Sequence, residues 1–339
     1  MFNKLSCPHD KFFKAVFTKK EEVKEFLNLY LPKEIASLID YESLTLVKTS
    51  FVDKQLKEYF SDLLYEVKIK GETAFIYLLF EHKSYPYELT SLQLLRYMVE
   101  IWQNLIKQGW YFKKLPVIIP LVIYHGLKRW NVPIKFCKNF SLKEKPLRVF
   151  IPNFSYLLFD LSHLSDEEIK GRVILQTSLL VMKYIFRDEL REKLKDVFKL
   201  LAELSAKETG IEYVETLLRY ITSGTDKVRV KDLEEAIKEI PKGGEIMQTI
   251  AQKWIEEGYK QGIQQGIQQG IQQGIQQGIQ QGIREGLLEA IELGLKLRFG
   301  LEGIKLFPRI TQIKEIERLR AIKEGIEIAK DVKEIERLL

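Results

Sequence analysis

Two apolar segments joined by a glycine-containing turn constrain the fold of this chain more than any other feature. Residues 61–69 and 73–82 are rich in Leu, Ile, Val, Tyr and Phe, a composition typical of buried β-strands. In the connection, 70–73, Gly71 and Glu72 suit the two central positions of a type II′ turn, which has glycine first. The segments therefore predict a β-hairpin in which the first and last residues of the connection face each other.

Three charged residues converge at the open end of this predicted hairpin. Asp62 falls opposite Glu81, with β-carbons roughly 5 Å apart, and Lys83 projects from the same face because it is two residues beyond Glu81. Two carboxylates suit Mg²⁺ or Mn²⁺, which polarises a phosphate and activates water. A lysine stabilises the developing charge or orients the attacking water. The pattern indicates a metal-dependent nuclease site; a structural ion pair at a strand end is the alternative.

Basic residues are concentrated next to this acidic segment. Residues 101–150 contain ten basic residues and one acidic residue, Glu144, a local net charge of +9. Residues 51–100 contain six basic and eight acidic residues, a local net charge of −2. Cations that bind a phosphate backbone beside carboxylates that hold a metal are the combination required for DNA cleavage. We therefore expect DNA as a partner; a solvated basic surface is the alternative.

Chain length and apolar content bound the class of protein. The 339 residues, 45% of them hydrophobic, predict two or three units with a sizeable core. Two cysteines, Cys7 and Cys137, provide neither a disulfide framework nor a zinc site. The longest apolar runs, 75–80 and 115–124, are far shorter than the ~20 residues that span a bilayer. We expect a soluble cytoplasmic protein with no membrane partner.

Hydrophobic periodicity predicts a mixed α/β order in the first half of the chain. The expected elements are a helix over 10–30, a strand over 44–52, the hairpin, a helix over 88–108, and strands over 115–124 and 154–160. Pro120 favours an edge or bulge within its strand. We expect a core domain over 1–163 and a helical subdomain over 164–258.

A strict four-residue repeat follows the helical subdomain. Residues 259–285 contain the repeat Gly-Ile-Gln-Gln, with glycine at 262 and every fourth position to 282. Each glycine costs about 1 kcal/mol in a helix relative to alanine, so a partner would be needed for stability. A self-associating helix, a length-variable spacer and disorder are the alternatives, and we favour a helical spacer that self-associates. The amphipathic tail, 286–339, predicts helices that dock on each other or on a second copy, which makes a homodimer attractive.

Three further polar residues are candidates for the site. Gln93 and Tyr97 share one face of the helix after the hairpin, where Gln93 could orient a metal-bound water or contact phosphate. A solvent-exposed glutamine is the alternative. His9 and Asp10 lie at the start of the first helix, where they either approach the site or Asp10 serves as the N-cap.

Several segments resemble the Rpn family of recombination-promoting nucleases, also described as transposases, of the PD-(D/E)XK nuclease superfamily. The resemblance is carried by HDKFFKAVF (9–17), SDLLYEV (61–67), YLLFEHKS (77–84), QLLRYMVEIW (93–102) and LPVIIPLVIYHG with a later Trp (115–130). It implies a PD-(D/E)XK-like mixed β-sheet core flanked by helices, followed by an all-α region, a long repeat helix and a small C-terminal helical tail.

The resemblance also implies a Mg²⁺-dependent DNA endonuclease. Asp62 and Glu81 would be the metal ligands, Lys83 the catalytic lysine and Gln93 an auxiliary site residue. His9 and Asp10 match the family's N-terminal motif, as possible accessory residues. Ser61 stands where the superfamily has a proline, which weakens the motif match without removing a ligand. The alternative is a non-catalytic, self-associating DNA-binding or interaction protein on a degenerate nuclease scaffold.

Overall fold

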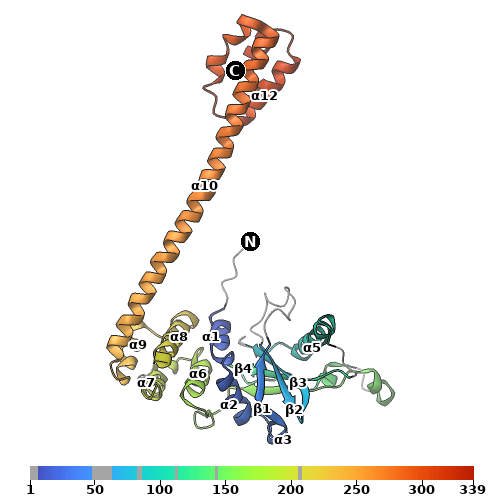
Figure 1. The fold of residues 1–339 in the computed structure, drawn as a ribbon, viewed down its shortest axis with the longest axis vertical. Helices are drawn as coiled ribbons and strands as arrows, with labels where there is room; N and C mark the ends of the chain where they lie inside the picture. Colours follow the sequence, from blue (N-terminus) through green and yellow to red (C-terminus); the bar gives the residue numbers. More distant parts are fainter. Residues whose placement is uncertain (1–6, 48–62, 82–85, 111–113, 142–143, 205–207) are drawn as a thin grey trace. The chain divides into compact units, whose positions relative to one another are not determined.

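The computed structural model describes residues 7–47, 63–81, 86–110, 114–141, 144–204 and 208–339. The chain divides into two compact units, residues 1–250 and 251–339. The first contains a β-sheet with helices around it (Figure 1). The mixed α/β class predicted from the sequence is therefore confirmed.

One five-stranded sheet forms the centre of the first unit. In order across the sheet, its strands are β1 (Ile39–Leu46), β2 (Leu63–Ile69), β3 (Glu72–Glu81), β4 (Val117–Tyr124) and β5 (Leu157–Asp160). β1, β2 and β3 are antiparallel neighbours, whereas β3, β4 and β5 run parallel. Parallel strands need a long crossover, and α5 (Thr90–Lys107) lies in the crossover from β3 to β4. The carboxyl ends of three strands therefore meet at one edge.

The turn between β2 and β3 differs from the predicted one. Ile69 pairs with Glu72, so the two loop residues are Lys70 and Gly71, and the predicted loop of Gly71 and Glu72 is wrong. Both loop residues have positive φ, 50° and 84°, as a type I′ turn requires. The type I′ geometry matches the right-handed twist of the flanking strands. The strand twist therefore favours a loop of Lys70 and Gly71, which the position of the glycine alone does not predict.

The predicted strand register is consequently shifted by two residues. Leu63 pairs with Leu78, whereas the predicted turn would have placed Leu63 opposite Phe80. Side chains alternate between the two faces of a strand with a period of two. A shift of two positions therefore changes which residues pair but leaves each residue on its predicted face.

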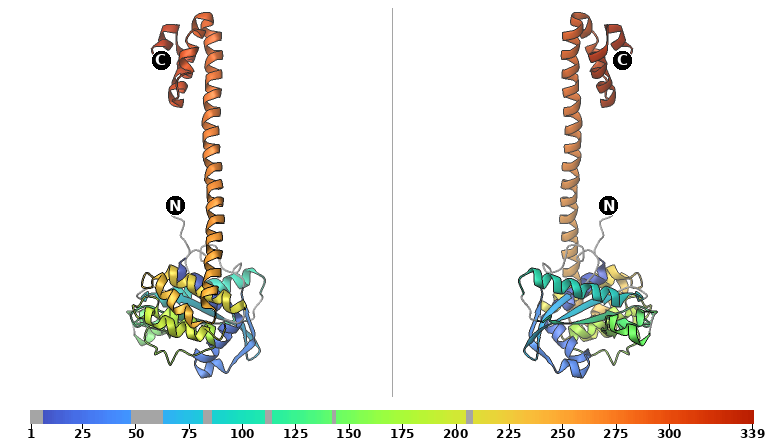
Figure 2. Two further views of the ribbon diagram at one scale, coloured as in Figure 1. Left: turned by 90° about the vertical axis from the view of Figure 1, so that its left-hand side faces the viewer. Right: turned by 90° about the vertical axis from the view of Figure 1, so that its right-hand side faces the viewer.

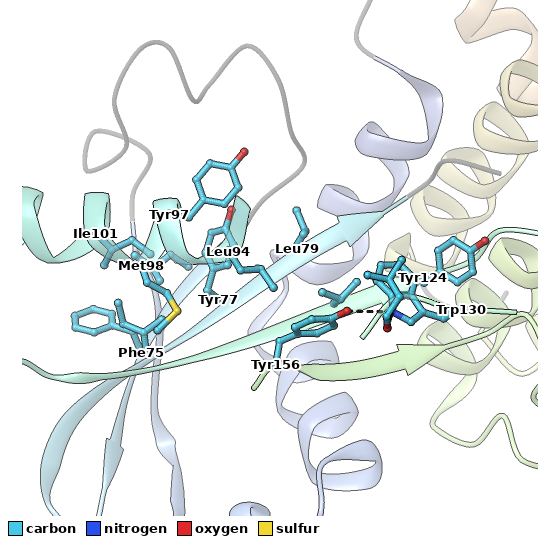
Figure 3. Close-up of a cluster of buried hydrophobic side chains, with 14 of the residues drawn as sticks. Phe75, Tyr77, Leu79, Leu94, Tyr97, Met98, Ile101, Tyr124, Trp130 and Tyr156 are labelled. Carbon is cyan, nitrogen blue, oxygen red and sulfur yellow. Dashed lines mark hydrogen bonds between the residues drawn. The ribbon is translucent and has the colours of Figure 1, made fainter. Parts of the chain in front are cut away.

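Helix α5 covers one face of the sheet. Phe75, Tyr77 and Leu79 alternate along β3 and belong to a buried cluster with Leu94 and Met98 of α5. Figure 3 shows these side chains gathered between the helix and the strands. Alternation on the strand and a continuous apolar stripe on the helix are the patterns that a two-layer core requires.

The opposite face of the sheet is covered by helices from the N-terminal segment (Figure 2). These are α1 (Pro8–Phe17) and α2 (Lys20–Tyr30), and the short α3 (Lys33–Ala36), none of whose residues is buried, follows α2 and precedes β1. The ring of Phe26 in α2 packs edge to face against Phe159 of β5, with centroids 4.9 Å apart. Buried apolar side chains on both faces explain why the central strands contain so few polar residues.

The single helix predicted over residues 10–30 is wrong, because the chain breaks between α1 and α2. Lys19 is extended, with φ −81° and ψ 117°, and precedes α2 as its N-cap residue. The break lets α1 pack against α8 (Glu208–Gly224) while α2 stays on the sheet. Phe12 of α1 and Tyr220 of α8 stack with ring centroids 4.1 Å apart. This long-range contact leaves no signal in the local periodicity.

Pro120 lies within β4, which has neighbours on both sides. It pairs with Tyr77 of β3, whereas β5 pairs only with Leu121–Tyr124. On the β5 side, Pro120 is therefore one residue outside the ladder, where a missing N–H breaks no described pairing. The expectation of an edge strand or a bulge is wrong, because β4 lies between β3 and β5 and its pairing with β3 runs through Pro120 without a register shift.

The remainder of the first unit consists mainly of helices. Two short 3₁₀ helices, η2 (Phe136–Asn139) and η3 (Lys145–Phe150), lie between β4 and β5. After β5 come α6 (Val173–Tyr184), α7 (Leu190–Leu201), α8, α9 (Val230–Ala236) and η4 (Ile237–Glu239).

The tetrapeptide repeats lie within α10 (Gly243–Ile304). The repeat isoleucines, from Ile263 to Ile283, are 37% to 59% exposed. A β-carbon added at any repeat glycine would meet nothing within 4 Å. The helical geometry is interrupted at Gly300, which has φ 57° and ψ −138°. Within the described chain, the repeat face of this helix is thus open to solvent.

Three short helices pack on the C-terminal part of α10. They are α11 (Phe307–Ile310), α12 (Ile316–Ile328) and α13 (Val332–Glu336). Ile291 and Leu295 of α10 share a buried core with Leu319, Ile322 and Ile335. These tail helices dock on each other and on α10 of the same chain. Among the described residues, no helix combines the length and apolarity needed to cross a bilayer.

Candidate active site

The three parallel strands end in one row. Glu81, the last residue of β3, pairs with Tyr124, the last residue of β4, and Tyr124 pairs with Asp160, the last residue of β5. Adjacent strands are about 4.8 Å apart, so the backbones of Glu81 and Asp160 lie roughly 10 Å apart across this edge. Open α/β sheets bind ligands at the carboxyl ends of their strands. This row marks the candidate site.

Two residues of the predicted triad, Asp62 and Lys83, lie outside the described residues. In the chain, Asp62 precedes β2 by one position and Lys83 follows β3 by two. β2 begins at Leu63, which pairs with Leu78, so β2 starts near the edge at which β3 ends. The convergence of Asp62, Glu81 and Lys83 stays a prediction, and the register assumed for it is corrected by two residues.

Gln93 of α5 is hydrogen-bonded to Tyr97, which in turn packs against β3. Its Nε2 donates a hydrogen bond to the hydroxyl of Tyr97 at 3.3 Å, so the two residues share a helix face as predicted. The Tyr97 ring packs against Tyr77 of β3, with centroids 5.4 Å apart (Figure 3). Tyr77 precedes Glu81 by four residues, about 13 Å along a strand. The half-buried Gln93 thus lies on the helix that covers β3.

The sequence prediction missed His125, which directly follows β4. The side chain of His125 is buried, at 1% exposure. Its ring stacks on Phe186 at 5.1 Å between centroids and lies 5.4 Å from the ring of His9. His125 Nδ1 donates to the Met182 carbonyl oxygen at 3.0 Å, since a carbonyl can only accept. The available signal was position: His125 comes immediately after the apolar run 115–124, where a parallel strand ends.

His9 lies in the first turn of α1 and contacts Tyr220 of α8. Its Nδ1 is 2.9 Å from the hydroxyl of Tyr220. Burial raises the pKa of Tyr220 well above its usual value, so this hydroxyl stays protonated. His9 therefore reaches the neighbourhood of His125, at the end of β4. The position of α1 beside the strand ends, which local sequence does not encode, brings the two histidines together.

Asp10 does not cap α1. The helix begins at Pro8 with Cys7 as its N-cap residue, so the alternative that Asp10 is the N-cap is wrong. Asp10 lies in the first turn, where a carboxylate interacts favourably with the helix dipole. Proline at the first helical position needs no hydrogen-bond partner for its nitrogen, which favours a start at Pro8.

Asp160 organises the loop that follows β4. Its buried carboxylate accepts hydrogen bonds from the backbone N–H groups of Trp130 and Ser162, both at 2.9 Å. The Trp130 indole N–H contacts the Val132 carbonyl at 3.0 Å and the Tyr156 hydroxyl at 3.1 Å (Figure 3). The hydrogen bonds of Asp160 thus give its carboxylate a structural role. Together with those of Trp130, they hold the loop after β4 against the edge of the sheet.

The donor set predicted for a metal is chemically suitable. Carboxylate oxygens are the ligands that Mg²⁺ and Mn²⁺ prefer, and the predicted pair is Asp62 and Glu81. In the described ranges, no three His, Cys, Asp or Glu side chains gather as a metal site. The backbone of Glu81 ends β3 at the row of strand ends, and the metal site predicted at Asp62 and Glu81 stays a prediction.

Comparison with protein families identifies the family to which the first unit belongs. A family model described as "Putative transposase, YhgA-like" matches residues 7–212, a range that includes all five strands. This chain belongs to the YhgA-like transposase family. No solved structure gives a significant match.

This YhgA-like family member is similar to several curated bacterial proteins. Recombination-promoting nuclease RpnA of Escherichia coli strain K12 is 30% identical over 254 residues, 75% of this chain and 85% of RpnA. Recombination-promoting nuclease RpnD of Escherichia coli O157:H7 is 28% identical over 249 residues, 73% of this chain and 94% of RpnD. The inactive recombination-promoting nuclease-like protein RpnE of strain K12 is 28% identical over 257 residues, 75% of this chain and 84% of RpnE. The predicted resemblance to recombination-promoting nucleases is confirmed.

Proposed function

We propose that this chain is a Mg²⁺-dependent DNA endonuclease with a PD-(D/E)XK-like core, which promotes recombination by cutting phosphodiester bonds. The observation that carries the proposal is the position of Glu81 in the row where β3, β4 and β5 end. Similarity to RpnA and RpnD, both named nucleases, supports it. Such cleavage needs carboxylates for an ion and a cation for the phosphate, and Asp62, Glu81 and Lys83 provide both.

Each residue has a distinct task in this proposal. Asp62 and Glu81 would hold the ion; when bound, it would polarise the scissile phosphate and lower the pKa of a water ligand. The Lys83 ammonium would stabilise the negative charge that develops on the phosphate, or orient the attacking water. Gln93 donates to Tyr97 through Nε2, which leaves its Oε1 to accept a hydrogen bond from the attacking water.

The test uses two glutamates at opposite ends of one strand. Glu81→Gln removes the charge at the proposed site, whereas Glu72→Gln removes the same charge at the first residue of β3. With Mg²⁺ and duplex DNA, we expect Glu81→Gln to lower the cleavage rate at least about a hundredfold and Glu72→Gln to leave it unchanged. Asp62→Asn and Lys83→Ala should match Glu81→Gln.

Two results would contradict this assignment. The first is full cleavage in EDTA, which would remove the metal from the reaction. The second is equal activity of the Glu81→Gln and Glu72→Gln proteins. Circular dichroism and thermal melting of each variant show whether a lost activity reflects the site or the fold.

A second candidate function is a non-catalytic, self-associating DNA-binding protein. This candidate is supported by RpnE, which is named inactive although it is about as similar to this chain as RpnA, which is named a nuclease. A salt-sensitive gel shift with no cleavage under Mg²⁺ or Mn²⁺ is the outcome expected for this candidate.

We also propose that the chain forms a homodimer through α10 and the C-terminal helices. Six half-exposed isoleucines, spaced by four residues from Ile263 to Ile283, run along α10. Four residues advance a helix by about 400°, so this stripe drifts about 40° per repeat. A partner helix that follows the stripe would wind right-handedly around α10. Burial of these side chains would offset the helix-weakening effect of the glycines.

A further inference from the structure

The loop after β4 presents exposed cations close to the row of strand ends. Lys128 and Arg129 are exposed and lie four and five residues beyond Tyr124, which pairs with Glu81. Lys135 and Lys138 are exposed further along the same segment. Within the described ranges, none of the four cations forms an ion pair with a carboxylate. Exposed cations beside a proposed phosphodiesterase site are suited to bind the backbone of its substrate.

These cations line two adjoining hollows. The first, of about 600 Å³, is lined by Lys128 and Arg129, together with Asn131, Asn139 and Glu88. The second, of about 450 Å³, is lined by Lys135 and Lys138, and both hollows include Pro133 in their lining. The four cations are therefore spread over two hollows that share Pro133, and a surface of this extent suits a polymer better than a small anion.

The surface is held in place by buried contacts. Trp130, directly after Arg129, is anchored by its backbone N–H to Asp160 at 2.9 Å. The Asn139 side chain donates to the hydroxyl of Ser91, a buried residue in the first turn of α5, at 2.5 Å. A loop whose backbone is anchored loses less conformational freedom on binding than a loose loop. The anchored loop is thus pre-organised to bind a ligand at the strand ends.

We propose that Lys128 and Arg129, extended by Lys135 and Lys138, form the surface that binds the phosphate backbone of duplex DNA beside the cleavage site. This inference rests on the proposed function, because it takes Glu81 as the site. Four residues reach at most about 14 Å, and one strand spacing adds about 5 Å. With 3.4 Å per base pair, Lys128 would contact phosphates within about six base pairs of the scissile bond.

The experiment measures DNA affinity as a function of salt. Fluorescence anisotropy with a labelled duplex, in EDTA and from 50 to 200 mM salt, gives the slope of log K against log salt concentration. Each phosphate contact contributes a slope of about −0.9. Lys128→Gln/Arg129→Gln should therefore reduce the slope by about 1.8, and Lys135→Gln/Lys138→Gln by a similar amount.

Two matched controls separate local contact from overall charge. Lys70→Gln/Lys114→Gln removes the same charge just before the first residues of β3 and β4, about 30 Å along the strands from Glu81. Lys128→Arg/Arg129→Lys keeps both charges in the loop. Neither control should change the slope by more than about 0.3.

The outcomes distinguish this inference from the proposed function. Equal slopes for the wild type and the Lys128→Gln/Arg129→Gln protein would overturn the inference while Mg²⁺-dependent cleavage by the wild type still stood. A slope change equal to that of the Lys70→Gln/Lys114→Gln control would overturn it too, because net charge alone would then explain the binding. A wild-type protein that neither binds nor cuts duplex DNA would overturn both.

Discussion

The carboxylate of Asp160 accepts a hydrogen bond from the backbone N–H of Trp130 at 2.9 Å. This contact joins the end of β5 to the loop after β4, and so joins the last strand of the sheet to the cations of the proposed DNA surface. Asp160 is the only carboxylate of the row Glu81–Tyr124–Asp160 whose side-chain contacts are described, and its oxygens already accept two backbone N–H groups. Its part in the site is therefore to hold the loop.

Removal of this carboxylate should destabilise the first unit. Asp160→Ala leaves the buried N–H of Trp130 and the partly buried N–H of Ser162 without an acceptor, and a buried group of this kind costs about 1–3 kcal/mol. We expect the free energy of unfolding, measured with urea, to fall by at least about 2 kcal/mol. Asp188→Ala is the matched control: Asp188 is 84% exposed and pairs with Lys227, a pair worth at most about 1 kcal/mol. Equal losses would contradict the anchoring role.

Asp166 should make stability dependent on pH. Partial burial raises the pKa of Asp166, but hydrogen bonds from Lys183, Lys193 and Tyr184 outweigh it and bring the pKa to about 2, from 3.8. Because the pKa in the folded state is the lower one, the stabilisation is complete above pH 3.8 and is lost as the pH falls toward 2. The shift corresponds to roughly 2 kcal/mol at neutral pH.

Asp166→Asn tests this contribution. The variant should be less stable than the wild type by roughly 2 kcal/mol at pH 7, and by about half as much at pH 3. Urea unfolding at both pH values measures the difference. A gap between the two proteins that is the same at pH 3 and pH 7 would show that the charge of Asp166 does not stabilise the fold.

The turn between β2 and β3 predicts two opposite effects on stability. Asn-Gly is the preferred pair for a type I′ turn, so Lys70→Asn should raise the free energy of unfolding by several tenths of a kcal/mol. Gly71→Val should lower it by about 1–3 kcal/mol, because φ is 84° there. Thermal melting of both variants provides the measurement. No gain from Lys70→Asn would favour the turn at Gly71 and Glu72 over the observed one.

The repeat glycines should weaken α10 as an isolated helix. Gly270→Ala/Gly274→Ala adds two methyl groups in open space and should strengthen the helix by about 1 kcal/mol per site. Hydrogen exchange of amides in α10 reports this gain as slower exchange. If the amide exchange rates are unchanged, the low helix propensity of glycine does not determine how often α10 opens.

Self-association should depend on the isoleucine stripe. Ile271 and Ile275 are 57% and 59% exposed, so a partner could bury about half of each side chain. Ile271→Gln/Ile275→Gln should weaken the dimer by about 2 kcal/mol, or roughly thirtyfold in Kd. Sedimentation velocity over a concentration series measures this change. Gln272→Ala/Gln276→Ala is the control that keeps the stripe, and an equal shift for both double variants would argue against the isoleucine interface.

Local sequence pattern was sufficient for several elements of the fold. The apolar composition on either side of Gly71 predicted the β2–β3 hairpin, helical periodicity predicted α5, and a continuous apolar run predicted β4. These elements are buried against neighbours, so their hydrophobic pattern reports directly on the face that packs. Pattern alone could not choose between loops that begin at Lys70 and Gly71, because the twist of the paired strands selects the turn type.

The sequence by itself determined that this chain contains a mixed α/β unit, a net-basic segment after the hairpin, and a helix with an isoleucine every fourth residue. Only the tertiary structure decided that Glu81, Tyr124 and Asp160 end in one row, and that His9 and His125 lie 5.4 Å apart. The physical reason is the range of the interactions. Periodicity is set by contacts within a few residues, whereas strand order and helix docking depend on burial between segments far apart in the chain.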